Sequence, residues 1–131
     1  MHITLETDYA VRIVEYLTKS EDKQDAGTIS ENVNIPLRFS LKILRKLVDS
    51  KIIKSYKGVK GGYMLNRAPK DITLREVIEA VEGKYTFSRC LHEQYDCNNT
   101  YCRFYEVYDE ISDLVRKKLE EFTFDMVKDE N

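Results

Sequence analysis

The sequence predicts a mainly α-helical fold that carries one small β-hairpin. Hydrophobic residues recur at three- and four-residue spacing through several segments, which is the period of a helix buried on one face. One stretch near the middle instead combines β-branched and aromatic residues on both sides of a glycine-rich turn. The chain has 131 residues, of which 42% are hydrophobic and 34% charged, so we expect an ordered chain and exclude a large two-domain enzyme.

Three short helices are expected in the first fifty residues. The first covers residues 8 to about 19 with Thr7 as its N-cap, and the second opens at a capping box that starts at Thr28. The third runs from Leu37 to about Ser50, directly after Pro36, a residue suited to the first turn of a helix. Its buried face is predicted to consist of four apolar residues: Leu41, Leu44, Leu47 and Val48.

A β-hairpin is predicted directly after these helices. Its strands cover residues 52–57 and 63–67, and the glycine-rich tip covers residues 58–62. Two helices joined by a short turn, with the second one basic and a hairpin behind it, are typical of a winged helix-turn-helix. We assign residues 1–67 to this DNA-binding unit and call the hairpin its wing.

The second half of the chain, residues 68–131, is predicted to hold two more helices. Thr73 opens a capping box before residues 74–82, and Gly83 follows as the C-cap. Residues 84–103 show no period and read as a loop. Residues 104–125 keep a helical spacing of apolar residues over about five turns, which is more apolar face than so small a domain needs. We expect this helix to form the interface of a homodimer.

Charge is concentrated on the third helix and the wing. The whole chain has a net charge of −2, but the stretch from Arg38 to Arg67 carries nine basic residues against one acidic residue. Such a stretch is either a solvated helix face or the contact surface for a polyanion, and its position in this motif favours double-stranded DNA. The predicted DNA contacts are Arg38, Ser40, Lys42, Arg45 and Lys46 on the helix, with Lys57 and Lys60 on the wing.

All three cysteines of the chain fall within thirteen residues of the predicted loop: Cys90, Cys97 and Cys102. Thiolates are soft ligands that iron–sulfur clusters, zinc and copper(I) select. Four interpretations stay open from the residues alone: an iron–sulfur cluster, a Cys3His zinc site completed by His92, redox-sensing thiols, and structural cysteines. An odd count of clustered thiols, without a signal peptide or a long apolar run, favours a reduced, cytoplasmic location and no membrane.

Four segments carry a resemblance to a known family. They are Thr4 to Arg12, the helix Ile35-Pro36-x2-Phe39-x3-Ile43-Leu44-x2-Leu47, the wing Gly58-x2-Gly61-Gly62-Tyr63-x-Leu65, and the helix Leu74-x2-Val77-Ile78-x-Ala80-Val81-Glu82-Gly83. In this order they resemble the Rrf-type winged-helix regulators, which include IscR-like, NsrR-like, RirA-like and CymR-like proteins. The resemblance implies a homodimeric bacterial transcription factor, and no catalytic triad, paired acid/base carboxylates or dinucleotide fingerprint suggests an enzyme.

The same resemblance implies an iron–sulfur cluster, [4Fe–4S] or [2Fe–2S], held by Cys90, Cys97 and Cys102. Where IscR-like proteins place a fourth ligand, this chain has Tyr105. NsrR-like proteins are more similar, because their partner chain supplies an aspartate at the position of Asp8. A sensor of redox state, nitric oxide or iron–sulfur supply is the function implied. The alternative, similar to CymR-like members, is a cluster-free regulator controlled by a partner protein or by thiol oxidation.

Overall fold

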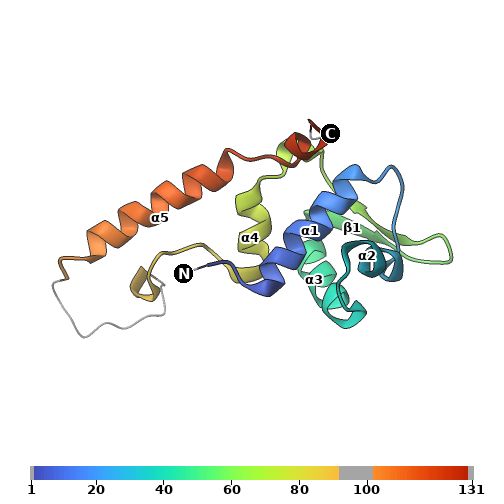
Figure 1. Ribbon diagram of the computed structural model, residues 1–131, viewed down its shortest axis with the longest axis horizontal. Helices are drawn as coiled ribbons and strands as arrows, with labels where there is room; N and C mark the ends of the chain where they lie inside the picture. Colours follow the sequence, from blue (N-terminus) through green and yellow to red (C-terminus); the bar gives the residue numbers. More distant parts are fainter. Residues whose placement is uncertain (1, 92–101, 130–131) are drawn as a thin grey trace.

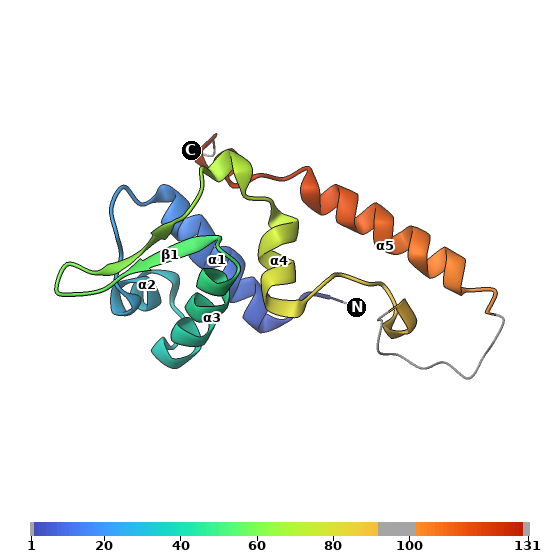
Figure 2. The same cartoon turned by 180° about the vertical axis from the view of Figure 1, so that it is seen from behind.

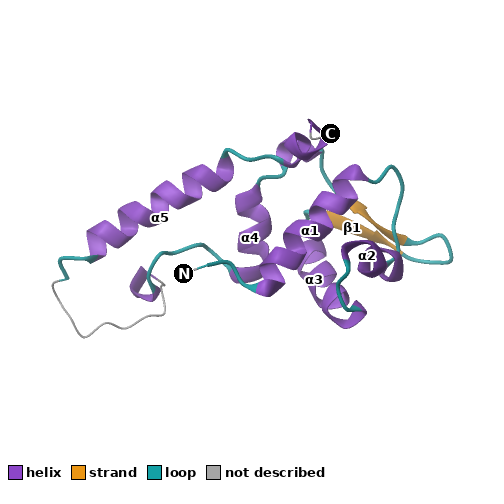
Figure 3. Cartoon of the chain, viewed as in Figure 1, coloured by secondary structure: helices purple, strands orange, loops and turns teal. Residues whose placement is uncertain are grey.

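The computed structural model describes residues 2–91 and 102–129, and the predicted fold class is confirmed there: five helices and a two-stranded hairpin (Figure 3). The order along the chain is α1 (Leu5–Lys19), α2 (Ala26–Val33), α3 (Leu37–Asp49), β1 (Ile53–Tyr56), β2 (Gly62–Leu65), α4 (Leu74–Glu82) and α5 (Tyr105–Glu120). Three 3₁₀ turns complete the described part: η1 (Pro69–Asp71), η2 (Arg89–Leu91) and η3 (Phe124–Asp129). None of the helices in this part combines the length and the apolar character that crossing a lipid bilayer requires.

Helices α1 and α2 both begin earlier than predicted. The side chain of Thr4, not Thr7, caps α1 and accepts a hydrogen bond from the Thr7 backbone N–H. Asp25 caps α2 in the same way by accepting from Thr28 N–H. Thr7 and Thr28, the residues predicted as caps, therefore lie at the third position of their helices. There each donates the free backbone N–H that the true cap accepts.

The core is built around α1, which lies across the other helices of the winged-helix body (Figure 1). Its buried side chains meet those of α2, α3 and α4, and the interior also includes Phe124 and Val127 from η3. The main chain of the same region pairs with the start of α4: Leu74 N–H donates to Phe122 at 3.0 Å, and Phe124 N–H donates to Ile72 at 3.1 Å. One core thus draws on both sides of the division that we placed at residue 67.

The wing is anchored at its base. Strands β1 and β2 are antiparallel, with Ile53 opposite Leu65 and Tyr56 opposite Gly62. The loop before α2 adds one further rung, because Gln24 and Tyr63 exchange backbone hydrogen bonds of 3.0 and 2.8 Å. The tip extends away from the body (Figure 1).

Helix α5 extends from the body at an angle, and from behind α4 stands between it and the winged-helix unit (Figure 2). It ends at Glu120, five residues before the predicted limit of 125, because the following residues pair with the start of α4. Two buried polar side chains of α5 hold the segment after α4: Ser112 accepts from Phe87 N–H at 2.8 Å, and Arg116 donates to the Tyr85 carbonyl at 2.8 Å. Several apolar side chains of α5, among them Val107 and Leu114, stay exposed in the single chain.

Candidate nucleic-acid interface and cysteine site

Helix α3 presents a basic outer surface because its opposite face is locked into the core. Ile43, Leu44 and Leu47 are fully buried. The predicted contact residues Arg38, Lys42 and Arg45 are exposed, and Lys46 is half-buried. On the wing, Lys57 and Lys60 are exposed. The structure therefore places six of the seven predicted DNA-contact residues at the surface of α3 and the wing.

Ser40 is the exception among these residues. Its side chain is 0% exposed, and its Oγ has no hydrogen-bond partner within the described chain. Ser40 lies three, four and seven residues before the buried positions of α3, so the helical period puts it on the core face. Leu41, which we predicted to be buried, is about half exposed instead. The prediction of a DNA contact by Ser40 is thus corrected: the buried face keeps Leu44 and Leu47 but takes Ser40 and Ile43 in place of Leu41 and Val48, a turn of about 60° about the helix axis.

The outer surface of α3 is not uniformly polar. Leu37, Phe39 and Leu41 are each about half exposed near its amino-terminal end. The Phe39 ring also contacts the Tyr9 ring edge-on, with centroids 6.4 Å apart. Exposed apolar side chains on a helix of this type can meet thymine methyl groups in the major groove.

Glu6 of α1 lies beside the basic residues of α3. Its Oε1 atom is 3.0 Å from Nζ of Lys46 and 3.6 Å from Nζ of Lys42. The same oxygen is shielded from solvent and accepts no hydrogen bond of good geometry among the described residues. One carboxylate therefore faces two of the predicted DNA-contact lysines.

Two further lysines near the wing were not predicted as contacts. The ammonium groups of Lys23 and Lys54 lie 4.6 and 5.5 Å from the centre of the Tyr56 ring. Lys23 comes from the loop before α2, which the Gln24–Tyr63 pairing brings to the wing. No sequence pattern marks Lys23, because its neighbours on the wing are more than thirty residues away in the chain.

The cysteine site is described in part. Cys90 on η2 and Cys102 just before α5 are free, half-buried thiols, and η2 packs against α5. The Cys90 sulfur lies 3.2 Å from the Ser88 hydroxyl, within hydrogen-bonding distance. Cys97 and His92 lie outside the described residues. Two soft ligands therefore fit an iron–sulfur or zinc site, whereas no group of three metal ligands comes together within residues 2–91 and 102–129.

Asp8 occupies the first turn of α1. Its carboxylate pairs with Arg12 at 3.1 Å and remains partly exposed. The start of this helix is tied to the end of α4, because Thr4 N–H donates to Glu82 at 2.9 Å. Burial alone would raise the pKa of Glu82, but hydrogen bonds from Thr4 and Thr7 outweigh it, so its pKa lies below the usual value.

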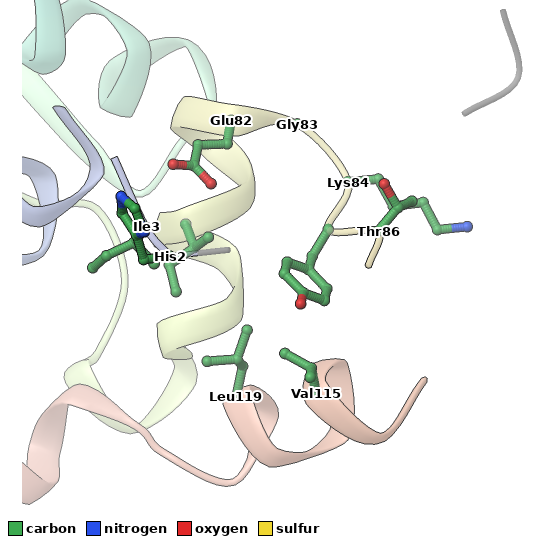
Figure 4. A pocket seen from close by; sticks show the side chains of 10 residues that line it. His2, Ile3, Glu82, Gly83, Lys84, Thr86, Val115 and Leu119 are labelled. Carbon is green, nitrogen blue, oxygen red and sulfur yellow. The ribbon is translucent and has the colours of Figure 1, made fainter. Parts of the chain in front are cut away.

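A cavity of about 320 Å³ separates the end of α4 from α5 (Figure 4). Val115 and Leu119 of α5 form one wall, and His2 and Ile3 lie opposite, beside Glu82. The cavity is thus lined by apolar side chains of α5 on one side and by the N-terminal segment on the other, at the junction between the body and α5.

Comparisons with known proteins cover most of the chain. The family model described as Rrf2, an iron-dependent transcriptional regulator, matches residues 3–130. The chain is 29% identical over 127 residues to the HTH-type transcriptional regulator NsrR of Halalkalibacterium halodurans, covering 94% of this chain and 87% of that protein. It is 34% identical over 84 residues to a Synechocystis protein assigned to the helix-turn-helix regulators; that match covers 63% of this chain but only 57% of the relative's length.

Solved structures show the same fold. The chain is similar to IscR of T. potens with a TM-score of 0.77 and 22% identity, covering 98% of this chain and 88% of that one. It is similar to CymR, the global cysteine regulator of B. subtilis, with a TM-score of 0.79 and 22% identity, covering 100% of this chain and 99% of that one.

Proposed function

Because this chain belongs to the Rrf2 family of iron-dependent transcriptional regulators, we propose that it is a dimeric, sequence-specific DNA-binding regulator that senses its signal through an iron–sulfur cluster. The signal is redox state, nitric oxide or iron–sulfur supply, and the protein acts in the bacterial cytoplasm. Members of the family regulate transcription and are not enzymes.

Helix α3 enters the major groove in this proposal. Arg38, Lys42, Arg45 and Lys46 supply positive charge along its outer surface, and Lys57 and Lys60 reach the flanking backbone from the wing. Contacts to phosphates set affinity and position, while side chains at base edges set sequence preference. In a dimer, two copies of α3 would contact sites about 34 Å apart, one turn of DNA.

The cluster would be held by Cys90, Cys97 and Cys102, with Asp8 of the partner subunit as the fourth ligand. When bound, a [4Fe–4S] or [2Fe–2S] group supplies an iron ion that small molecules such as nitric oxide can reach at the exchangeable oxygen ligand. The chain's own part is positional: the thiols on either side of residues 92–101 and Asp8 at the start of α1 join the loop of one subunit to the winged-helix body of the other. Release of that link shifts the population of dimers between two spacings of α3.

One observation carries this proposal. All three cysteines of the chain lie within residues 90–102, and the two that are described, Cys90 and Cys102, are free and half-buried next to α5. Structural cysteines of a core would be fully buried among apolar side chains, whereas Cys90 faces the Ser88 hydroxyl.

The test is the iron, sulfide and zinc content per chain after anaerobic purification, with the visible spectrum recorded in parallel. We expect iron with matching sulfide in the parent protein, loss of both in Cys97→Ala, and a weakened or altered spectrum in Asp8→Ala. Asp22→Ala, which changes an exposed loop carboxylate, is the control and should match the parent.

Two outcomes contradict the cluster. Zinc without sulfide would indicate the Cys3His alternative with His92. A protein that contains no iron, sulfide or zinc would favour the cluster-free regulator controlled by a partner protein or by oxidation of Cys90 and Cys102.

A further inference from the structure

We propose that Glu6 competes with DNA phosphates for Lys42 and Lys46 and thereby sets how strongly α3 binds DNA. The inference rests on the proposed role of α3 in DNA binding. It concerns a residue of α1 that would not itself touch DNA.

The geometry favours a shared ion pair over two separate contacts. Both lysine Nζ atoms approach the same Glu6 oxygen, at 3.0 Å for Lys46 and 3.6 Å for Lys42. The Glu6 side chain is 25% exposed, whereas that of Lys42 is 61% exposed and can turn to another anion. Because this oxygen accepts no hydrogen bond of good geometry among the described residues, the two ammonium groups are what balance its charge.

The lysines also need such a partner. Lys42 and Lys46 are four residues apart on α3, so their like charges face each other on one side of the helix and repel. Glu6 relieves this repulsion in the free protein. A DNA phosphate would relieve it too, so each lysine must leave or share Glu6 when it binds DNA.

This competition lowers the affinity for DNA of any sequence. Binding to DNA of arbitrary sequence depends almost entirely on phosphate contacts. A carboxylate that the lysines must leave or share before they meet a phosphate lowers that affinity. Glu6 would therefore limit how strongly the protein is retained on random DNA.

The experiment measures affinity for a random-sequence duplex of about 30 base pairs, long enough for both half-sites of a dimer, by fluorescence anisotropy over a series of salt concentrations. We expect Glu6→Gln to bind about fivefold more tightly at low salt, with the gain fading as salt screens the charges. Glu15→Gln is the matched control, because Glu15 lies on the same helix and pairs with Lys19 at 3.0 Å, away from α3. It makes the same change in net charge and should bind like the parent.

A second background separates competition from a general charge effect. In Lys46→Gln protein, Glu6→Gln should change affinity much less than in the parent, because the two substitutions remove the same pair. Equal gains in both backgrounds, or equal gains for Glu6→Gln and Glu15→Gln, would overturn the proposal. So would a loss of stability in Glu6→Gln with unchanged DNA affinity, since Glu6 would then only join α1 to α3.

Failure of the wider function has a different signature. A parent protein whose affinity for duplex DNA does not fall with salt would contradict DNA binding by α3, and the role of Glu6 with it. A parent that binds DNA in a salt-dependent way, together with a Glu6→Gln variant identical to it, would contradict the role of Glu6 alone.

Discussion

Two fully buried serines of this chain use their hydroxyls in opposite ways. Ser40 on α3 has no hydrogen-bond partner for its Oγ among the described residues. Ser112 on α5 accepts from Phe87 N–H at 2.8 Å and donates to the Tyr108 carbonyl at 2.9 Å. A buried hydroxyl without a partner destabilises a fold, whereas one that satisfies a buried N–H stabilises it.

We expect Ser40→Ala to leave the free energy of unfolding unchanged or to raise it, and to leave DNA affinity unchanged. Ser112→Ala should lower the free energy of unfolding by about 1–3 kcal/mol, because the Phe87 N–H loses its acceptor. Urea unfolding of both variants checks the pair. A folded Ser40→Ala protein with clearly weaker DNA binding would contradict the burial of this side chain.

The sequence predicts charged surface residues better than it predicts which face of a helix is buried. The basic surplus on α3 and the wing is visible directly, because each lysine and arginine counts wherever it points. The face of α3 was predicted from its leucines, although Ser40 shares a face with Ile43 and Leu47. The Glu6 pair could not be predicted, because its partners are more than thirty residues apart and no local period connects them.

At the scale of elements, the wing depends on glycines at its tip and at the start of β2, where a Cβ atom on Gly62 would lie 2.9 Å from the Gln24 backbone. A Cβ atom at Gly61 would overlap the backbone of Tyr56 and Gly58. The turn at the tip therefore cannot keep its backbone conformation with any residue other than glycine at position 61. Gly27 in α2 differs, because a Cβ there would meet only Asp25 Oδ2 at 3.7 Å, an ordinary contact.

Gly61→Ala is expected to distort the tip and weaken DNA binding while the core stays folded. Gly27→Ala serves as the control and should stabilise the protein by about 0.5–1 kcal/mol, the helix propensity difference between the two residues. Thermal unfolding and DNA titration of each variant test this. Wild-type DNA affinity in Gly61→Ala would show that the wing tip makes no contact.

The hydrogen bond from Thr4 N–H at the start of α1 to the Glu82 carboxylate at the end of α4 is predicted to stabilise the fold in a pH-dependent way. The pKa of Glu82 is lowered from its usual value of 4.5, so its carboxylate stabilises the fold above that pH and loses this effect as the pH falls through the folded-state pKa. Glu82→Gln should therefore be less stable than the parent at neutral pH, and the difference should shrink in acid. Urea unfolding of both proteins at several pH values measures it; a constant difference would contradict the tie.

The bounds of α4 were predictable from its local sequence. Thr73 caps the helix as the capping-box pattern with Glu76 predicts, by accepting a hydrogen bond from Glu76 N–H at 3.1 Å, and Gly83 follows the last helical residue. The end of α5 was not predictable, since apolar residues keep their helical spacing past Glu120 while the main chain turns to pair with Ile72 and Leu74. A long-range pairing of this kind leaves no local signal.

At the scale of the whole molecule, α5 and the residue before it expose several large apolar side chains in the single chain. Leu114 is 68% exposed, and Phe104 and Val107 are about half exposed. Exposed apolar side chains gathered on one helix are typical of a surface that another protein covers. A second copy of this chain is the partner that we propose.

Leu114→Lys should therefore shift the protein from dimer to monomer without unfolding it. Asp109→Lys places the same side chain on a polar part of α5 and is the control. Sedimentation velocity reads out the mass of each variant. A dimer of unchanged stability in Leu114→Lys would show that this side of α5 lies outside the interface.

Helix α5 is held to the rest of the chain at several points along its length. Its carboxyl end is joined to α4 by the Arg75–Glu120 ion pair and by the hydrogen bond from Leu74 N–H to Phe122. Farther along, Ser112 and Arg116 hold the segment that leads from α4 to Cys90. The 16 residues of α5 span about 24 Å, and its amino end lies directly after Cys102. A displacement at the cysteine site would therefore be transmitted to the start of α4 by one stiff strut.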